Sequence, residues 1–364
     1  MRINDLDTPV VVVDVDVMER NLRRAADYTR RHGLALRPHT KTHKTPEIAR
    51  RQVELGAPGI AVAKVGEAEV MADAGLDDIL IAYPQVGAQK MHRLMALCER
   101  ARVRVALDSE ESATQIARAA AAAGHTIGIL VEVDTGMRRC GLPIGPELVA
   151  LCRKVRDLPG LEFLGVQVYQ GHVRGALAER EKHLVEENAR LRRLYDTLSS
   201  ASLSCAVISG GSTPNLAQSH LLDGLTEVRP GTYVFNDRNT IETGACAMED
   251  VALHVIATVV STAVSGQAII DGGSKTFSSD LVHGSAERGH GIAVEDPGVF
   301  ITRMNEEHGV LDLGAATREY RVGDRVTIVP NHVCTVVNLH DQLALHRAGE
   351  VVGAYRVAGR GKLR

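Results

Sequence analysis

The amino-acid sequence predicts an α/β protein, in which a (β/α)8 TIM-like barrel is followed by a β-rich domain. Apolar runs of strand length alternate with amphipathic segments of helix length through about the first 230 residues, and this pattern is typical of parallel strands joined by crossover helices. Eight such runs occur there, which is the number that closes a barrel. Near Glu249 the sequence changes to β-rich runs separated by Gly and Asp turns. We therefore expect a barrel domain over residues 1–245 and a β-rich domain over residues 246–364.

Each expected barrel strand is a short apolar run, and the segments between the strands carry the Ala, Leu, Glu and Arg that favour helices. A doubly wound open sheet is the alternative, but no Gly-x-Gly-x-x-Gly turn follows an early strand. The strands are expected at Ala35–Arg37, Gly59–Ala63, Asp78–Tyr83, Val103–Asp108, Ile127–Asp134, Phe163–Tyr169, Ala206–Gly211 and Glu227–Gly231, and helices at Pro46–Leu55, Gly66–Ala74, Glu110–Ala123, Pro146–Arg156 and Ala176–Ser199.

The second domain is expected to be built from strands at Val251–Thr262, Ala268–Asp271, Arg325–Val329 and Cys334–Leu339. A further strand-like run, Pro9–Val15, exceeds the count of eight barrel strands. It could join either domain.

Composition narrows the class of protein. The net charge is -3 and aromatic residues make up 3% with no Trp, which argues against a nucleic-acid-binding protein. The chain starts without an apolar signal segment and contains no apolar run near the length of a membrane helix. The six cysteines are scattered without paired spacing, as reduced thiols are. A cytoplasmic enzyme is the expectation.

The run from Arg37 to Lys44 places two lysines among histidines directly after the first expected barrel strand. Neighbouring cations lower the pKa of a lysine amine, and a neutral amine is what forms a Schiff base with a carbonyl cofactor. A solvated basic loop is the plain alternative. Lys41 is the candidate amine.

Unusual residues follow several of the expected strands. Function in a barrel gathers at the carboxyl ends of the strands, so these residues are expected on one rim. They are Lys41 after the first strand, Asp134 to Gly141 after the fifth, Tyr169 to His172 after the sixth, Ser209 to Pro214 after the seventh and Arg229 to Tyr233 at the eighth.

The seventh and eighth strands offer an anion cradle. Backbone N–H groups and hydroxyls in a turn of small residues bind a phosphate, and barrels commonly bind phosphate at this position. A phosphate seat together with a Schiff-base lysine is what pyridoxal 5'-phosphate (PLP) requires. The residues expected to hold the cofactor here are Ser209, Gly210, Gly211, Ser212, Thr213, Gly231, Thr232 and Tyr233.

These motifs make the chain resemble the fold-type III PLP enzymes of the alanine racemase superfamily, and most closely the D-threonine aldolase and D-serine dehydratase branch. The signature Arg-Pro-His-x-Lys-Thr-His-Lys carries the resemblance and implies that Lys41 binds the cofactor while Lys44 is a supporting charge. The resemblance also implies that Arg139 contacts the ring oxygen of the cofactor and that Tyr169 lines its ring. A homodimer acting on a small D-amino acid is implied as well.

His332 and Cys334 are the candidate metal ligands. On the expected strand, positions i and i+2 face the same side, so an imidazole and a thiolate would meet one ion. Two ligands suit a catalytic metal with open positions, and the nitrogen and sulfur pair favours zinc, with manganese as the alternative. The resemblance places Glu306 to Gly309 near the substrate.

The resemblance leaves two lyase reactions open. In familiar D-threonine aldolases the metal pair is His-x-Asp and a histidine lies six residues beyond the strand-six tyrosine, whereas this chain has Cys334 and Gly175. The turn Gly-Gly-Ser-Thr-Pro also resembles the dehydratases. These departures favour β-elimination, with Lys41 taking the α proton, although His172 could serve an aldolase as the hydroxyl base. A racemase is the third choice, because it needs a second base and neither Tyr320 nor Tyr355, the two tyrosines of the β-rich region, has the sequence setting of that base.

Overall fold

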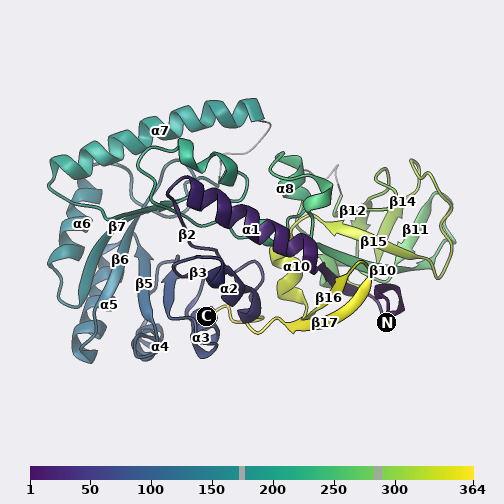
Figure 1. Ribbon diagram of the computed structural model, residues 1–364, viewed down its shortest axis with the longest axis horizontal. Helices are drawn as coiled ribbons and strands as arrows, with labels where there is room; N and C mark the ends of the chain where they lie inside the picture. Colours follow the sequence, from purple (N-terminus) through teal and green to yellow (C-terminus); the bar gives the residue numbers. More distant parts are fainter. Residues whose placement is uncertain (172–176, 283–284, 286–288) are drawn as a thin grey trace. The chain divides into compact units, whose positions relative to one another are not determined.

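The computed structural model describes residues 1–171, 177–282, 285 and 289–364, which form two compact units (Figure 1). The barrel unit comprises residues 24–41, 46–231 and 362–364. The β-rich unit comprises residues 1–23, 42–45 and 232–361. Within the described residues, no helix is both long enough and apolar enough to cross a bilayer.

The barrel unit contains eight parallel strands in the order β2-β9-β8-β7-β6-β5-β4-β3. The ring is closed beyond the ends of β2 and β3 by a parallel bridge between His39 and Ala61, where Thr40 N–H donates to Ala61 O at 2.8 Å. The eight strands predicted from the sequence are confirmed. They are β2 (Ala35–Leu36), β3 (Ile60–Val62), β4 (Asp78–Ile81), β5 (Arg102–Leu107), β6 (Ile127–Val133), β7 (Leu161–Val168), β8 (Val207–Gly210) and β9 (Glu227–Val228).

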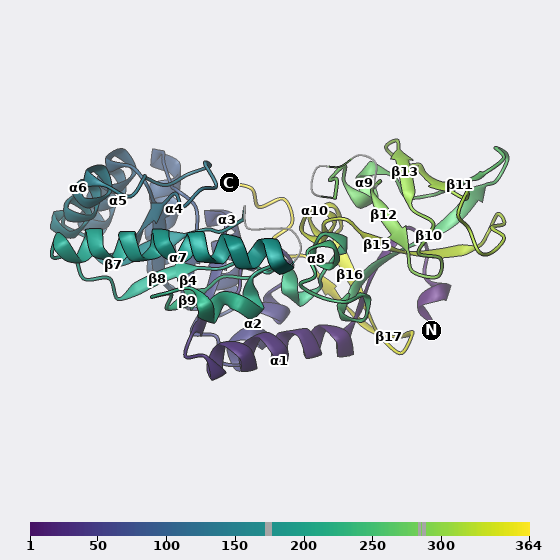
Figure 2. The same cartoon turned by 90° about the horizontal axis from the view of Figure 1, so that it is seen from above.

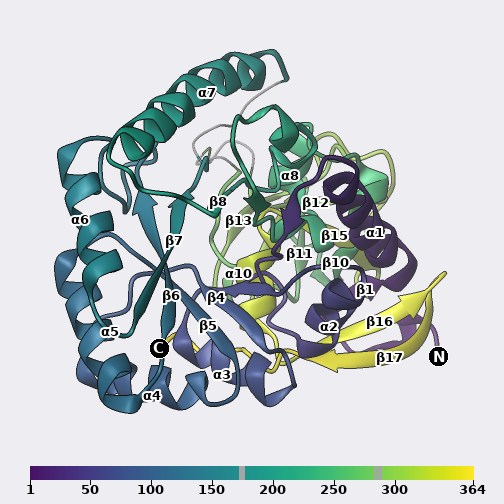
Figure 3. The same ribbon diagram turned by 60° about the vertical axis from the view of Figure 1, so that its left-hand side comes forward.

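Helices connect successive barrel strands, and α3 to α6 form an arc outside them (Figure 3). The ends of α5 show how local sequence sets these boundaries: Ser109 Oγ accepts a hydrogen bond from Ser112 N–H at the start, and Gly124 adopts a φ of 70° at the end. The connecting helices are α2 (Pro46–Glu54), α3 (Val65–Asp73), α4 (Ala88–Cys98), α5 (Glu110–Ala123), α6 (Pro146–Asp157), α7 (Leu177–Ser200) and the 3-10 helix η2 (Leu216–Leu221).

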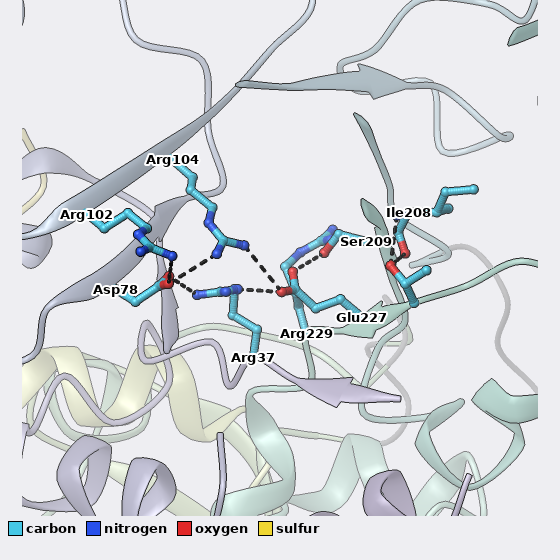
Figure 4. A network of polar contacts seen from close by, with 9 residues as sticks. Arg37, Asp78, Arg102, Arg104, Ile208, Ser209, Glu227 and Arg229 are labelled. Carbon is cyan, nitrogen blue, oxygen red and sulfur yellow. Dashed lines mark hydrogen bonds and ion pairs between the residues drawn. The ribbon is translucent and has the colours of Figure 1, made fainter. Parts of the chain in front are cut away.

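A buried ionic network joins the barrel strands (Figure 4). Arg37 is 1% exposed and donates through Nε to Glu227 at 2.6 Å and through a terminal nitrogen to Asp78 at 2.7 Å. Burial lowers the pKa of Arg37, but the two carboxylates outweigh burial and raise it. Ser209 Oγ donates to the other oxygen of Glu227 at 2.6 Å and accepts from Arg229. The network therefore ties β8 to β9 and β4 underneath the candidate anion cradle.

Replacing Glu227 with alanine is expected to destabilise the protein by about 3–5 kcal/mol, because it leaves the buried guanidinium of Arg37 short of a counter-charge. The measurement is the free energy of unfolding from a denaturant titration. The matched control removes Asp223, whose 2.6 Å ion pair with Arg192 is largely exposed, and should cost less than about 1 kcal/mol. Equal losses in the two variants would contradict a structural role for the network.

The β-rich unit contains strands in the order β13-β14-β11-β10-β1-β16-β17, with β15 paired to β10 and β12. The run at Pro9–Val15, which the sequence left unassigned, forms β1 here, antiparallel to β10 and parallel to β16. The strands predicted at residues 251–262, 268–271 and 325–329 are confirmed. The strands are β1 (Val10–Asp14), β10 (Leu253–Ser261), β11 (Gln267–Ile270), β12 (Gly291–Ala293), β13 (Ile301–Met304), β14 (Gly309–Asp312), β15 (Arg325–Pro330), β16 (Gln342–Arg347) and β17 (Glu350–Arg356).

Short helices lie beside these strands, with α9 next to α10 (Figure 2). Helix α1 (Val15–Arg31) begins in the β-rich unit and ends in the barrel unit. The others in the β-rich unit are η1 (Ile3–Asp5), η3 (Thr232–Val234), α8 (Arg238–Glu242), η4 (Met248–Asp250), α9 (Ser274–Phe277) and α10 (Val333–Leu339).

The strand predicted at Cys334–Leu339 is wrong, because these residues belong to α10. Val333, Val336 and Val337 are fully buried, and this i, i+3, i+4 spacing is that of a helix face. The carboxylate of Asp237 accepts a hydrogen bond from Val333 N–H at 3.1 Å at the start of the helix. Tertiary capping and packing thus outweigh the β propensity of the valines and threonine in this segment.

Candidate active site

Lys41 lies in a turn beyond the end of β2, and its side chain is partly buried. Backbone hydrogen bonds fix the segment before it on both sides: His39 N–H donates to Pro230 O at 2.9 Å, and Thr40 N–H donates to Ala61 O. Lys41 therefore occupies the carboxyl rim of the barrel, as the sequence predicted for a catalytic amine.

Lys44 is held differently from Lys41. Its side chain is 5% exposed and its Nζ donates to Asn338 Oδ1 at 2.7 Å. The amine of Lys44 is therefore engaged by a side chain of α10.

Arg139 and Tyr169 come together on the barrel rim. The guanidinium of Arg139, beyond β6, lies 4.8 Å from the ring centroid of Tyr169, beyond β7. Gly171 packs so closely against the ring that a Cβ there would lie 2.2 Å from a ring carbon of Tyr169. The structure therefore fixes the tyrosine ring against a cation in the loop after β6 and a glycine on its own segment.

The candidate anion cradle begins where β8 ends. Gly211 has a φ of 76°, and its N–H donates to Gln170 Oε1 at 2.9 Å. A Cβ at Gly210 would lie 2.8 Å from carbons of both Leu225 and Val168, so a larger residue would displace this turn. The buried Nε2 of Gln170 finds no hydrogen-bond partner in the described part of the chain. A tight turn beside an unsatisfied donor fits a bound phosphate.

The structure places the predicted cradle residues in three settings. Ser212 and Thr213 follow the glycine turn, whereas the hydroxyl of Ser209 is committed to Glu227 and Arg229 in the buried network. Burial lowers the pKa of Arg229 to about 10 despite nearby carboxylates, which leaves it charged at neutral pH. Gly231 ends the barrel segment, while Thr232 and the buried Tyr233 belong to η3 of the β-rich unit.

His332 and Cys334 lie together at the start of α10, with His332 as the residue that precedes its first turn. His332 Nδ1 is 2.6 Å from Asp280 Oδ2. Burial lowers the pKa of His332, but Cys334, Asp237 and Asp280 outweigh burial and raise it to about 10. A carboxylate on Nδ1 is the arrangement that orients a metal-binding imidazole, so the pair fits a divalent metal although it lies on a helix terminus and not on a strand.

Among the described residues, no group of three or more His, Cys, Asp or Glu side chains is arranged to hold a metal. His172, the other candidate base, lies outside the described residues.

Sequence reasoning missed Asp237, Asp280 and Gln170. Asp280 lies 52 positions before His332, so no local spacing connects the two. Asp237 begins α8 and also caps α10. Only the first of these roles has a local signal, because an Asp at the start of a helix is a preferred cap.

The barrel with its rim lysine and glycine turn defines the class of fold-type III PLP enzymes. Residues 13–239 match the family model for the N-terminal domain of alanine racemase, and residues 252–346 match the model for a putative serine dehydratase domain. The chain belongs to the alanine racemase superfamily, in its D-serine dehydratase and D-threonine aldolase branch, and is a PLP-dependent lyase.

Curated relatives carry out more than one lyase reaction. A D-threonine aldolase of Arthrobacter sp. is 36% identical over 361 residues, covering 98% of this chain and 93% of the relative. A D-threo-3-hydroxyaspartate dehydratase of Delftia sp. is 37% identical over 360 residues, covering 90% of this chain and 91% of the relative. The family therefore identifies β-hydroxy D-amino acid chemistry but does not separate aldolase from dehydratase.

The solved structures that resemble this one also include both an aldolase and a dehydratase. The D-threonine aldolase of Filomicrobium marinum has a TM-score of 0.93 at 33% identity, covering 100% of this chain and 98% of that one. The Delftia dehydratase has a TM-score of 0.88 at 34% identity, covering 98% of each chain. Two variants of a D-threo-3-hydroxyaspartate dehydratase replace a histidine and, two positions along, a cysteine with alanine, and the cysteine variant is described as metal-free.

Proposed function

We propose that this protein is a PLP- and metal-dependent lyase that converts β-hydroxy D-amino acids to a 2-oxo acid and ammonia, as a D-serine dehydratase does. The observation that carries the proposal is the pairing of His332 with Cys334, supported by the 2.6 Å contact of His332 with Asp280. The two ligands have the same residue types and spacing as the histidine and cysteine replaced in the dehydratase variants.

In this proposal Lys41 has two roles. It would hold the cofactor through its side-chain amine, and the same amine, when free, would take the α proton of the substrate. PLP, when bound, supplies the electron sink for the Cα carbanion. Arg139 and Tyr169 orient the cofactor ring, and the backbone of residues 210–213 with the hydroxyls of Ser212 and Thr213 binds its phosphate. We infer no direct phosphate contact for Ser209, because its hydroxyl is engaged below the turn.

We propose zinc as the metal, because imidazole and thiolate together suit it better than manganese. The metal would supply a Lewis acid for the departing hydroxyl group. Asp280 holds His332 so that its other ring nitrogen is available as a ligand, and Asp237 fixes the start of the helix that carries Cys334.

Retro-aldol cleavage is the second candidate, and the TM-score of 0.93 to a D-threonine aldolase favours it. That reaction needs a base for the β-hydroxyl proton in place of a leaving hydroxide. His172 is our candidate for that base. Racemisation remains third, because Tyr320 is 5% exposed and stacks with Arg318 at 4.5 Å, a packed setting unlike that of a second catalytic base.

Product analysis separates these reactions. With PLP and zinc, the purified protein is expected to form pyruvate and ammonia from D-serine and 2-oxobutyrate and ammonia from D-threonine, with no turnover of the L-enantiomers as controls. Glycine and acetaldehyde from D-threonine would establish the aldolase instead. Inversion of D-serine without either set of products would establish a racemase.

Three further expectations accompany this function. We propose a cytoplasmic homodimer, in keeping with the resemblance to the superfamily. We also propose sequence domains at residues 1–245 and 246–364. The family models, which end at residue 239 and begin at residue 252, support that limit.

A further inference from the structure

Helix α10 holds the residues that follow Lys41 through two side-chain contacts. Thr42 Oγ1 lies 3.2 Å from Cys334 Sγ, and Lys44 Nζ donates to Asn338 Oδ1 at 2.7 Å. Cys334 and Asn338 are four residues apart and therefore lie on the same face of the helix. The candidate metal ligand thus supplies one of the contacts between α10 and this segment.

The held segment is tightly enclosed. Thr42, His43 and Thr45 are fully buried and Lys44 is 5% exposed. Lys44 adopts a φ of 52°, which is unfavourable for a lysine, and its carbonyl accepts a hydrogen bond from Gly359 N–H at 2.9 Å. A conformation of this kind persists only where its surroundings impose it, so a change at α10 is transmitted to the segment and not absorbed by it.

A metal on His332 and Cys334 would fix the position of the Cys334 sulfur. Thr42 Oγ1 lies 3.2 Å from that sulfur, so a sulfur held by the metal also restricts the hydroxyl of Thr42. The hydroxyl that is fixed in this way belongs to the residue joined to Lys41 by a peptide bond.

We propose that α10 couples the metal site to the cofactor lysine, so that a metal on His332 and Cys334 tightens the binding of PLP at Lys41 through Thr42. Asn338 is a second positioning residue, because it holds Lys44 and so keeps the segment on the helix. The inference rests on the proposed function, since it takes Lys41 as the cofactor lysine and the His332 and Cys334 pair as the metal ligands. Coupling of this kind is reciprocal, so PLP must tighten the metal to the same extent.

The test is the affinity of the apoprotein for PLP, measured by visible absorbance with and without Zn²⁺. Borohydride reduction followed by peptide mass spectrometry confirms that the cofactor is on Lys41. In the wild type, Zn²⁺ is expected to lower the dissociation constant of PLP by about fivefold to tenfold, within the usual range of such couplings. Amide hydrogen exchange of the peptide spanning residues 39–46 should slow on addition of Zn²⁺ alone.

Variants at position 42 test whether the coupling between metal and PLP depends on the hydroxyl of Thr42. Thr42→Val keeps the shape of the side chain and removes the hydroxyl, so both ligands should still bind while the effect of Zn²⁺ on PLP disappears. Thr42→Ser keeps the hydroxyl and should retain the coupling. Asn338→Ala should reduce the coupling and speed exchange in residues 39–46 without changing the affinity for Zn²⁺ alone.

The possible failures are distinguishable. A wild-type protein that binds PLP and Zn²⁺ with independent affinities overturns this inference and leaves the proposed function standing, and this comparison needs no variant that could misfold. Equal coupling in Thr42→Val and the wild type would also overturn it. A wild-type protein that fails to bind either ligand contradicts the proposed function itself.

Discussion

Replacement of Lys41 with alanine is expected to abolish covalent attachment of PLP and to reduce turnover by about 10⁴-fold or more, because one amine serves as both the attachment point and the α-proton base. The structure gives this lysine a partly buried position on the barrel rim, directly after His39 and Thr40, whose N–H groups are hydrogen-bonded to the carbonyls of Pro230 and Ala61. The measurements are loss of the visible absorbance of bound cofactor, loss of the borohydride-reduced peptide, and the rate of product formation.

The matched control for this prediction is Lys44→Ala. Lys44 Nζ donates to Asn338 at 2.7 Å, so its removal should weaken the protein's hold on the segment but leave the cofactor linked to Lys41. A reducible cofactor adduct that survives in Lys41→Ala and disappears in Lys44→Ala would transfer the role to Lys44. Exogenous primary amines should partly restore proton abstraction to Lys41→Ala if only the base is missing.

The barrel could be predicted from sequence because parallel strands buried on both faces leave a distinct local pattern. All seven residues of β6 are buried, for example, and the first five, Ile127 to Val131, form a continuous apolar run that only Glu132 interrupts before the strand ends. The rim residues followed from the same pattern, because each lies just beyond such a run. The closure of the ring by His39 and Ala61 and the pairing of β1 with β10 and β16 have no local signal, since each joins residues far apart in the chain.

The segment around Cys334 shows where local sequence misleads. Its valines and threonine favour a strand, although the buried positions 333, 336 and 337 follow a helical period. The assignment of His332 and Cys334 as metal ligands stays a prediction. Ser209 shows the converse limit. A serine in a small-residue turn predicts a phosphate ligand from local sequence, whereas the hydrogen bonds of its hydroxyl with Glu227 and Arg229 join residues 18 and 20 positions apart and have no local signal.

Replacement of Cys334 with alanine is expected to remove bound zinc and to reduce turnover by about 10²-fold to 10³-fold, as the loss of electrostatic stabilisation at a departing oxygen does. His332 alone is a poor site, because one imidazole cannot match the three or four ligands of typical zinc sites. Metal content per chain and the rate should therefore fall together. Treating the wild type with a chelator should reproduce the loss, and adding Zn²⁺ should reverse it only where Cys334 is present.

Two variants make the metal assignment specific. Cys246→Ala removes another partly buried thiol of the same unit, one that donates to Thr240 at 3.4 Å, and it should keep its zinc. Asp280→Asn leaves both ligands but weakens the hold on His332, so the affinity for zinc should fall by roughly 10-fold to 100-fold. Chelation, Cys334→Ala and Asp280→Asn each remove or weaken the same bound ion in a different way. A protein that stays fully active after chelation would therefore show that the β-hydroxyl group leaves without a metal. The proposed removal of the α proton by Lys41 would then be kept, and the proposed role of the metal would be rejected.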